Sequence, residues 1–298
     1  MLERPSARTV GPVTARRAAG SRLRMLLANR PLMLGGLLLT GLILFAASAP
    51  LFPYDPIQPR LDARLEGPSF AHILGTDDLG RDLLTRLAHG ARFSLLMGTG
   101  AVLLAAAVGL PLGLVAGYRG GLWDLLLMRL VDALITLPAI VLAVAIVSVL
   151  GSGAGSVAVA VGITSVPTFG RLARAAALGL REQEFVLAAR ALGANELRIL
   201  GRHLLPNALA PVVVQASLGM GNTILVASAL GFLGLGVQPP APEWGAMLSR
   251  GRVYVSTAPH LVAFPGLAIA LAVLGFNFLG DGLRDALDPR VRTFLKRS

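Results

Sequence analysis

The sequence contains no cysteine among its 298 residues, and its one lysine is Lys296. Without thiols the chain forms no disulfide, ligates no metal through cysteine and uses no thiolate in catalysis. A nucleotide-binding P-loop needs a lysine inside the pattern G-x-x-x-x-G-K-[ST], whereas Lys296 lies in the stretch FLKRS. The chain therefore has no P-loop of its own.

Charged residues are scarce as well. They make up 14% of the chain, and 54% of its residues are hydrophobic, whereas about a quarter of a soluble domain is charged. Apolar runs of roughly 20 residues, the length that spans a bilayer as a helix, recur along the chain. We therefore expect an all-α polytopic membrane protein with six transmembrane helices, at about residues 32–52, 93–117, 127–150, 156–176, 208–236 and 261–281.

The net charge of +11 comes mainly from arginines in the two tails and in one internal segment. Seven arginines precede residue 32, while residues 53–92 carry five basic and six acidic side chains. Because basic segments stay in the cytoplasm, this pattern predicts cytoplasmic termini and an extracytoplasmic 53–92 segment. The same pattern explains the positive charge without nucleic acid as a partner.

The first apolar run is followed by Ala47-Ser48-Ala49, which has the form of a signal-peptidase site. The run is longer than the 7–15 apolar residues typical of a signal peptide, and Pro50 follows at once. We expect it to be an uncleaved first span.

Ionisable side chains are missing from the middle of the predicted spans. Ion-coupled carriers usually hold their ion with intramembrane carboxylates or histidines, although backbone carbonyls can still bind Na⁺. A channel or ion-coupled carrier therefore remains the alternative to a chain powered by a partner. A membrane-embedded enzyme is disfavoured, since the spans show no nucleophile–base pair and the four histidines have no metal-ligand spacing. The charged residues nearest to the spans lie toward their predicted cytoplasmic ends: Arg129, Asp132, Arg171 and Arg174.

Proline and glycine recur within the spans. A proline removes a helical hydrogen bond and bends the helix, and glycines spaced by four give a small face for close helix contact. Together they predict bent, closely packed helices. The residues are Pro111, Pro138, Pro167, Pro211 and Pro265, and the glycine series Gly109, Gly113 and Gly117.

The segment REQEFVLAARALGANELRILGRHLLPN, residues 181–207, is too charged for lipid and too short for a domain. Phe185, Ala189 and Leu192 share one face of a predicted helix, Gly193 suits its end, and a second helical stretch follows. The pattern fits a docking device for a cytoplasmic partner, and equally an amphipathic segment lying in the lipid headgroups.

The stretch AARALGANELRILGRHLLPN resembles the EAA loop of ABC importer permeases, whose coupling helix fits a cleft on the ATPase subunit. Leu187 stands where that family carries glutamate. Four further stretches, HILGTDDLGRDLLTRLAHGARFSL (72–95), GYRGGLWDLLLMRLVDALITLP (117–138), FLGLGVQPPAPEWGAML (232–248) and LGDGLRDALDPR (279–290), resemble the C-type permease of the peptide/opine/nickel importer family. Only about the first 30 residues lie outside the resemblance.

The resemblance implies the type I ABC importer transmembrane fold in a bacterial inner membrane. It divides the chain into a cytoplasmic tail (1–30), a first span with an extracytoplasmic segment (31–91), a permease core (92–281) with a coupling loop (181–205), and a C-terminal tail (282–298). The implied partners are a second related permease, identical or different, two cytoplasmic ATPase subunits that bind ATP and magnesium, and an extracytoplasmic binding protein. The chain itself would be no enzyme and bind no cofactor. Its cargo would be di- or oligopeptides, with nickel chelates and opines remaining open.

Two groups of residues are the candidate sites. The ATPase-coupling group is Phe185, Ala188, Ala189, Arg190, Leu192, Gly193, Ala194, Arg198 and Pro206. The extracytoplasmic group is Gly75, Thr76, Asp77, Asp78, Gly80, Arg81 and Asp82.

In the extracytoplasmic group, Thr76 is placed to cap a helix with acids in its first turn. That helix either braces the bundle from the surface or meets a binding protein. Further along, the stretch GVQPPAPEWGAML predicts a proline-stiffened loop and a short helix whose Trp244 sits at the membrane interface. Loop rigidity, gating and contact with the binding protein all remain open for it.

Overall fold

The structure, a computed structural model, describes residues 29–287. This part is helical, and the pairing of Thr76 with Asp82 is the one isolated β-bridge within it. The main helices are α2 (Arg30–Ala47), α3 (Leu83–Arg119), α4 (Gly121–Ala133), α5 (Ala139–Leu150), α6 (Ala154–Leu180), α7 (Glu184–Ala191), α8 (Glu196–Arg198), α9 (Leu205–Phe232), α10 (Trp244–Gly251) and α11 (His260–Leu287). Short turns of 3-10 helix cover Ala49–Leu51, Leu61–Ala63 and Arg252–Tyr254, and a π-helical turn, η3 (Ile199–Leu204), joins α8 to α9.

Five helices are long and apolar enough to cross a membrane: α2, α3, α6, the continuous helix Glu196–Phe232, and α11. The predicted helical membrane fold is confirmed. The prediction of one helix over 127–150 is wrong, because α4 ends at Ala133 and α5 begins at Ala139, after Pro138. Proline lacks the N–H that would continue the helix, and it disfavours helical backbone in the residue before it. Pro138 stands immediately before α5 as its N-cap residue, so it precedes a new helix instead of bending a continuous one.

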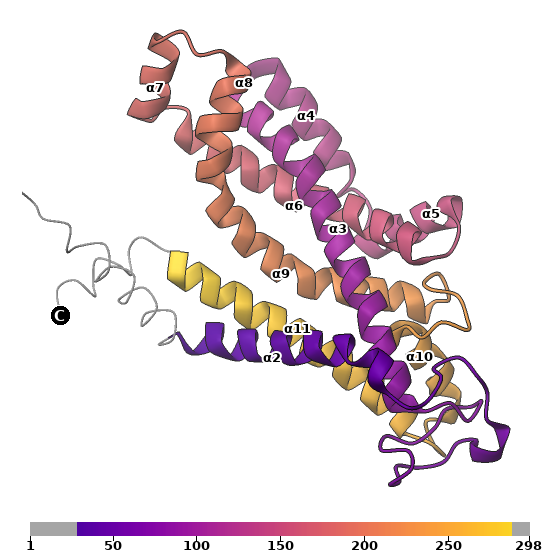
Figure 1. The fold of residues 1–298 in the computed structure, drawn as a ribbon. Helices are drawn as coiled ribbons and strands as arrows, with labels where there is room; N and C mark the ends of the chain where they lie inside the picture. The colour runs from indigo at the N-terminus through magenta and orange to yellow at the C-terminus, as the bar shows by residue number, and fades with distance from the viewer. Residues whose placement is uncertain (1–28, 288–298) are drawn as a thin grey trace, which may run out of the picture.

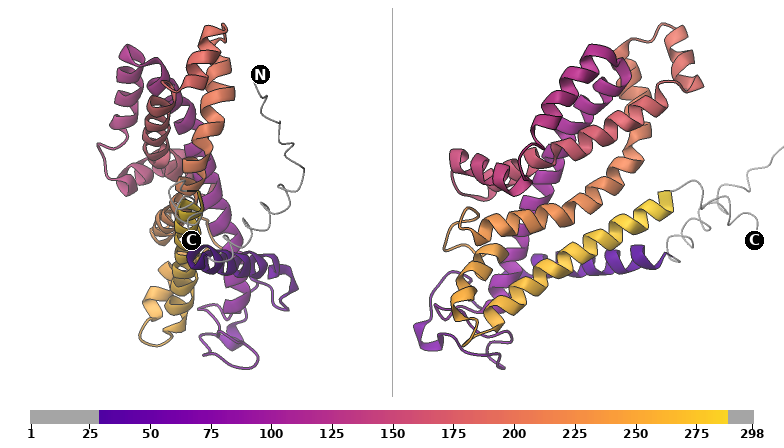
Figure 2. Two further views of the ribbon diagram at one scale, coloured as in Figure 1. Left: turned by 90° about the vertical axis from the view of Figure 1, so that its left-hand side faces the viewer. Right: turned by 180° about the vertical axis from the view of Figure 1, so that it is seen from behind.

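The helices form two groups that meet at one end of the molecule (Figure 1). In one group α3, α6 and α9 run side by side, while in the other α2 lies along α11 (Figure 2). The segment between α2 and α3, together with α10, lies where the groups meet, and we call this the loop end. The helix α7 stands at the opposite end of α3, which we call the α7 end.

The predicted glycine face packs α3 against α6. A β-carbon added at Gly113 would lie 2.1 Å from the carbonyl oxygen of Gly170, closer than any real contact allows. Similar additions at Gly109 and Gly117 would come within 2.8 Å of backbone atoms of α6. Glycine is therefore required for these backbones to approach, and the predicted close helix contact is confirmed.

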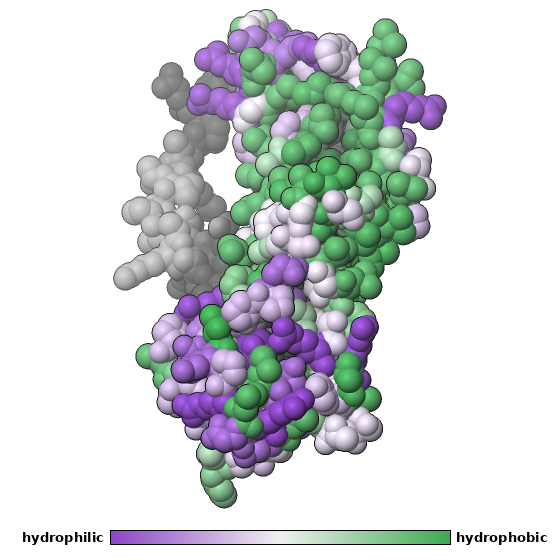
Figure 3. All heavy atoms as spheres, turned by 90° about the vertical axis from the view of Figure 1, so that its right-hand side faces the viewer, coloured by the Kyte–Doolittle hydropathy of each residue, from purple (hydrophilic) through white to green (hydrophobic). Residues whose placement is uncertain are grey.

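The surface carries the pattern of a protein that lies in lipid. Apolar side chains cover the middle of the molecule, and hydrophilic ones gather at its two ends (Figure 3). Large apolar side chains such as Leu37, Leu103 and Leu130 are more than 60% exposed. A bilayer would cover this surface, because soluble proteins rarely expose such an extended apolar area to water.

Candidate functional sites at the two ends of the helix bundle

At the α7 end, residues 181–205 fold as a helix, a turn and the start of a second helix. The first helix, α7, ends before Gly193, whose φ of +79° only glycine adopts freely. The predicted stop at Gly193 is confirmed. The second stretch is longer than expected, since α8 runs through η3 into α9 as one helix of 37 residues. Pro206 does not interrupt it; the proline follows closely after the π-helical turn η3, and a helix with such a turn can continue past a proline.

The outward side of this segment is apolar. Leu192 is 88% exposed and Leu197 is 81% exposed, and Phe185 and Leu187 are each more than 40% exposed. Only Val186 of α7 is buried, and on the predicted face Phe185 and Leu192 are exposed while Ala189 is half-buried, so most of this face does not pack on the bundle. Leucines presented among charged side chains are typical of a surface that another protein covers. Of the nine predicted coupling residues, Ala189 and Ala194 are half-buried, and the exposed ones are Phe185, Ala188, Arg190, Leu192, Gly193, Arg198 and Pro206.

We call residues 181–205 the coupling segment. Two side-chain contacts that the sequence did not reveal join it to the end of α3. Arg119 donates from Nε to Oε2 of Glu196 at 2.9 Å. The guanidinium of Arg190 lies 5.4 Å from the ring centre of Tyr118. Each contact is exposed and contributes little to stability. The segment packs on α3 mainly through a buried apolar cluster that includes Leu114, Val186 and Leu204. These two contacts were not predictable from the sequence, because the residues that form them are far apart in the chain.

At the loop end, the residues predicted to be extracytoplasmic form a buried polar cluster. The carboxylate of Asp77 accepts hydrogen bonds from the backbone N–H of Leu79 and of Arg81, both at 2.9 Å. It also accepts one from Nε of Arg81 at 2.8 Å and lies 3.3 Å from Nε of Arg86. Asp77, Arg81 and Arg86 are all less than 10% exposed. We call this group the Asp77 cluster.

The prediction that Thr76 caps the following helix is wrong. The helix α3 begins only at Leu83, and Asp82 caps it by accepting hydrogen bonds from N–H and Oγ1 of Thr85, at 2.8 and 2.7 Å. Between Thr76 and Asp82 the chain turns at Gly80, which has a φ of +73°, so Asp77 and Asp78 lie in a loop and not in a helical turn. Thr76 is itself buried and accepts a hydrogen bond from the N–H of Glu66 at 2.9 Å.

The seven residues predicted to be extracytoplasmic are therefore brought together, and all of them except the half-buried Asp78 are buried. Beside them lies a cavity of about 20 Å³, lined among others by Asp78 and Arg250, which has room for about one water molecule. The charges are largely satisfied by one another, and the cavity is too small for a peptide. The geometry favours the bracing interpretation, with the brace being a buried loop and not a surface helix.

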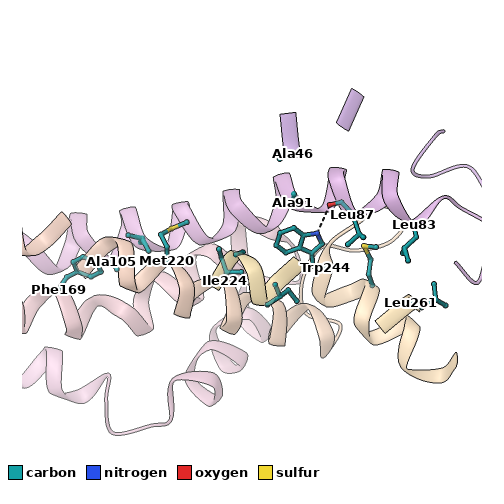
Figure 4. Close-up of a cluster of buried hydrophobic side chains, with 14 of the residues drawn as sticks. Ala46, Leu83, Leu87, Ala91, Ala105, Phe169, Met220, Ile224, Trp244 and Leu261 are labelled. Carbon is teal, nitrogen blue, oxygen red and sulfur yellow. Dashed lines mark hydrogen bonds between the residues drawn. The ribbon is translucent and has the colours of Figure 1, made fainter. Parts of the chain in front are cut away.

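Trp244 does not lie at the membrane interface as predicted. The side chain is fully buried, and its Nε1 donates to the carbonyl oxygen of Leu87 on α3 at 3.0 Å (Figure 4). The expected short helix is present as α10, and it is capped by the buried Glu243, which accepts from the N–H of Gly245 at 2.7 Å and of Ala246 at 2.8 Å. Trp244 thus anchors α10 on α3.

Burial raises the pKa of Glu243 from its usual 4.5 to about 7, although the two backbone N–H groups act in the opposite direction. Between about pH 4.5 and 7 the folded protein keeps a proton that the unfolded chain has lost. This contribution to stability is complete below pH 4.5 and disappears as the pH rises through 7. We expect the stability of the wild type relative to Glu243→Gln to fall by about 3 kcal/mol across this window.

Thermal unfolding in mild detergent, measured at several pH values, checks this expectation. Glu66→Gln is the matched control, because Glu66 is exposed. A wild type and a Glu243→Gln variant with parallel pH profiles would contradict the assigned pKa.

A second and larger cavity, of about 240 Å³, lies between α3, α6 and α9. Its lining carries no ionisable group, and more than half of it consists of neutral polar side chains. No sequence motif marked these residues, because uncharged polar side chains are common in membrane helices. The lining is Val102, Ser165, Thr168, Phe169, Gln215, Leu218, Gly219, Asn222 and Thr223. Within residues 29–287, no group of three or more acidic or histidine side chains is arranged to hold a metal ion.

Comparisons with known proteins agree with this architecture. The sequence model of the family described as "Binding-protein-dependent transport system inner membrane component" matches residues 109–293. The dipeptide transport system permease protein DppC of Alkalihalophilus pseudofirmus is 49% identical over 91% of this chain and 89% of the relative. The glutathione transport system permease protein GsiD of Escherichia coli is 51% identical over 81% of this chain and 77% of the relative. Among solved structures, an inward-facing MetNI methionine ABC transporter chain has a TM-score of 0.54 at 22% identity, covering 68% of this chain and 97% of that one.

Proposed function

Since the chain belongs to the family of binding-protein-dependent transport system inner membrane components, we propose that it forms one half of the passage for short peptides in an ATP-driven importer. It is a transport subunit and not an enzyme. The relatives named above are permeases for dipeptides and for glutathione, both short peptides. A di- or tripeptide permease of Pseudomonas aeruginosa is 49% identical over 87% of this chain. Peptides are therefore the cargo class that the relatives share.

One observation carries the proposed partnership with an ATPase. The coupling segment presents exposed apolar side chains among charged ones, at the end of a bundle whose own sequence has no P-loop. Such a surface is typical of one that a protein partner covers. Two ATPase subunits that bind ATP and magnesium would supply the energy, one of them docking here. A second related permease would supply the other half of the passage, and a binding protein would deliver the peptide at the loop end.

The proposed topology follows from the same surface. If the ATPase docks at the α7 end, that end faces the cytoplasm and the loop end faces outward. The start of α2 and the end of α11 both point away from the loop end (Figure 2), which is consistent with cytoplasmic termini. The arginine-rich first 28 residues and the last 11 residues lie outside the described part of the chain.

The helix that begins in the coupling segment offers a mechanical route. Glu196, which pairs with Arg119, and Asn222, which lines the larger cavity, stand on one uninterrupted helix, Glu196–Phe232. A shift of the docked ATPase would move this helix as a body, and rigid-body shifts of helices are a common basis of switching. ATP binding and hydrolysis would in this way alter the cavity without any nucleotide on this chain.

Purification from mild detergent with this chain as bait, followed by an ATPase assay and peptide uptake in liposomes, tests the proposal. We expect a second permease and an ATPase to co-purify and the reconstituted complex to take up dipeptides only with ATP. A lone chain that transports in liposomes without ATP would instead identify a channel or an ion-coupled carrier.

A further inference from the structure

We propose that the cavity of about 240 Å³ between α3, α6 and α9 binds the backbone amide groups of the transported peptide. This inference rests on the proposed function and adds to it a site and a mode of recognition. The site would grip what all peptides share and would leave the choice among side chains to other parts of the importer.

The position of the cavity fits a passage. Its lining residues stand near the middle of each contributing helix: Val102 in α3, Ser165 in α6, and Leu218 in α9. Each of these helices is long enough to cross a membrane. The cavity therefore lies at the depth where a polar solute would find no water in the surrounding lipid. Polar side chains at that depth cost free energy unless they form hydrogen bonds.

The hydrogen-bonding groups of the lining divide into two kinds. The hydroxyls of Ser165 and Thr223 donate to carbonyl oxygens of their own helices, at 2.8 Å to Val161 and 3.0 Å to Met220. The amides of Gln215 and Asn222 make no side-chain hydrogen bond to any residue between 29 and 287. On this chain Asn222 is exposed and Gln215 is half-buried, so the cavity is open at the surface of the bundle. At the depth of the lipid tails an amide without a partner costs free energy, so a ligand or another chain is expected to meet these two groups.

The chemistry of the free groups selects the ligand class. A side-chain amide carries both donors and an acceptor, and it therefore complements the C=O and N–H of a peptide bond. The lining has no charge that could bind a peptide terminus or an acidic or basic side chain. Its volume is just below the roughly 300–1,000 Å³ of small-molecule pockets, as expected where a second permease would complete the wall.

The competing occupant is the second permease itself, because amides often bond across helices in membranes. The peptide is favoured, because an importer needs polar groups along its passage, and this lining supplies them midway along three helices that are long enough to cross a membrane. The two occupants predict different results in the experiments below.

The first test of the site measures the kinetics of dipeptide uptake by the reconstituted complex. We expect Gln215→Leu and Asn222→Leu each to raise KM about fivefold, the loss of one hydrogen bond, with the maximal rate retained. The increase should be the same for alanyl-alanine and aspartyl-alanine, because the contact is to the backbone. The control is Ser217→Ala on the same helix, whose hydroxyl donates to Val213 at 3.1 Å and does not line the cavity.

An unchanged KM in both leucine variants would overturn the site while leaving peptide transport by the wild type intact. A wild-type complex that takes up no peptide would overturn the proposed function instead. The two failures are therefore distinguishable.

The absence of cysteine allows a direct test of occupancy. With Asn222→Cys as the single thiol, a maleimide should label the cavity, and saturating alanyl-alanine with binding protein and ATP should slow labelling several-fold. Ser217→Cys should show no protection. Unprotected labelling at position 222, or a disulfide from it to a cysteine placed in the second permease, would show that the cavity is not a peptide site.

Discussion

Replacing Asp77 with alanine is expected to lower the free energy of unfolding by about 3–5 kcal/mol, because it leaves buried positive charge without its partner. Arg81 and Arg86 both approach the Asp77 carboxylate, and both are nearly inaccessible to solvent. The N–H groups of Leu79 and Arg81 would lose their acceptor at the same time. The loop that carries the Asp77 cluster would then detach from α3. Unfolding by a denaturing detergent, with the fraction folded followed by proteolysis, measures the effect.

A matched pair of variants separates the charge from the position. Asp62→Ala removes an exposed carboxylate from the same segment and should change stability by less than about 0.5 kcal/mol. Asp77→Asn keeps an acceptor for the backbone N–H groups but not the charge, and should fall between the two. If Asp77→Ala were as stable as Asp62→Ala, the Asp77 cluster would not hold the loop end together.

Features that depend on neighbours in the chain were predictable from the sequence. The apolar runs marked the spans, the four-residue spacing of Gly109, Gly113 and Gly117 marked a close helix contact, and Gly193 marked the end of α7. Each of these signals is local, because the length of a helix, the residues that share one of its faces and the sign of φ at its end depend on a short stretch of sequence. The contact made by the glycines is confirmed, since backbone atoms of α6 occupy the space that a β-carbon at each of these positions would need.

Features that depend on distant residues were not predictable. Trp244 resembles an interfacial aromatic in sequence, but its partner, Leu87, stands 157 residues away, and only the fold brings them together. Asp77 and Asp78 look like the first turn of a helix, because nothing local shows that Asp82 is the better cap. Pro138 predicted a bend in one helix over 127–150, because a bent helix and two separate helices give the same apolar pattern.

The larger cavity illustrates a different limit. Gln215 and Asn222 stand seven residues apart on α9 and so share a face of the helix, which sequence alone would reveal. That this face meets a space and not another helix depends on how α3 and α6 pack. Mid-span amides without an ionisable neighbour are therefore a weak sequence signal that gains meaning only with the cavity.

Changing Leu192 to glutamate is expected to abolish coupling to the ATPase. Leu192 is 88% exposed on the coupling segment, so the change should not disturb folding or membrane insertion. A buried apolar contact at a protein interface can contribute 2 kcal/mol or more, and a charge in its place adds the cost of desolvation. We expect co-purification of the ATPase and ATP-dependent peptide uptake to fall more than tenfold.

Leu61→Glu is the matched control for this change, because Leu61 is 68% exposed at the opposite, loop end of the molecule. It should leave the amount of co-purified ATPase unchanged. Equal losses in both variants would point to a general effect of the charge, and no loss with Leu192→Glu would mean that the exposed leucines lie in the lipid headgroups, the alternative that the sequence left open. Because this segment packs on α3 through a buried cluster that includes Val186 and Leu114, a docked partner would act on α3 and on the 37-residue helix Glu196–Phe232 at once. Leu192→Glu can be combined with Asn222→Cys. If the ATPase no longer co-purifies while a maleimide still labels position 222, energy coupling at the α7 end is separable from peptide binding in the middle of the bundle.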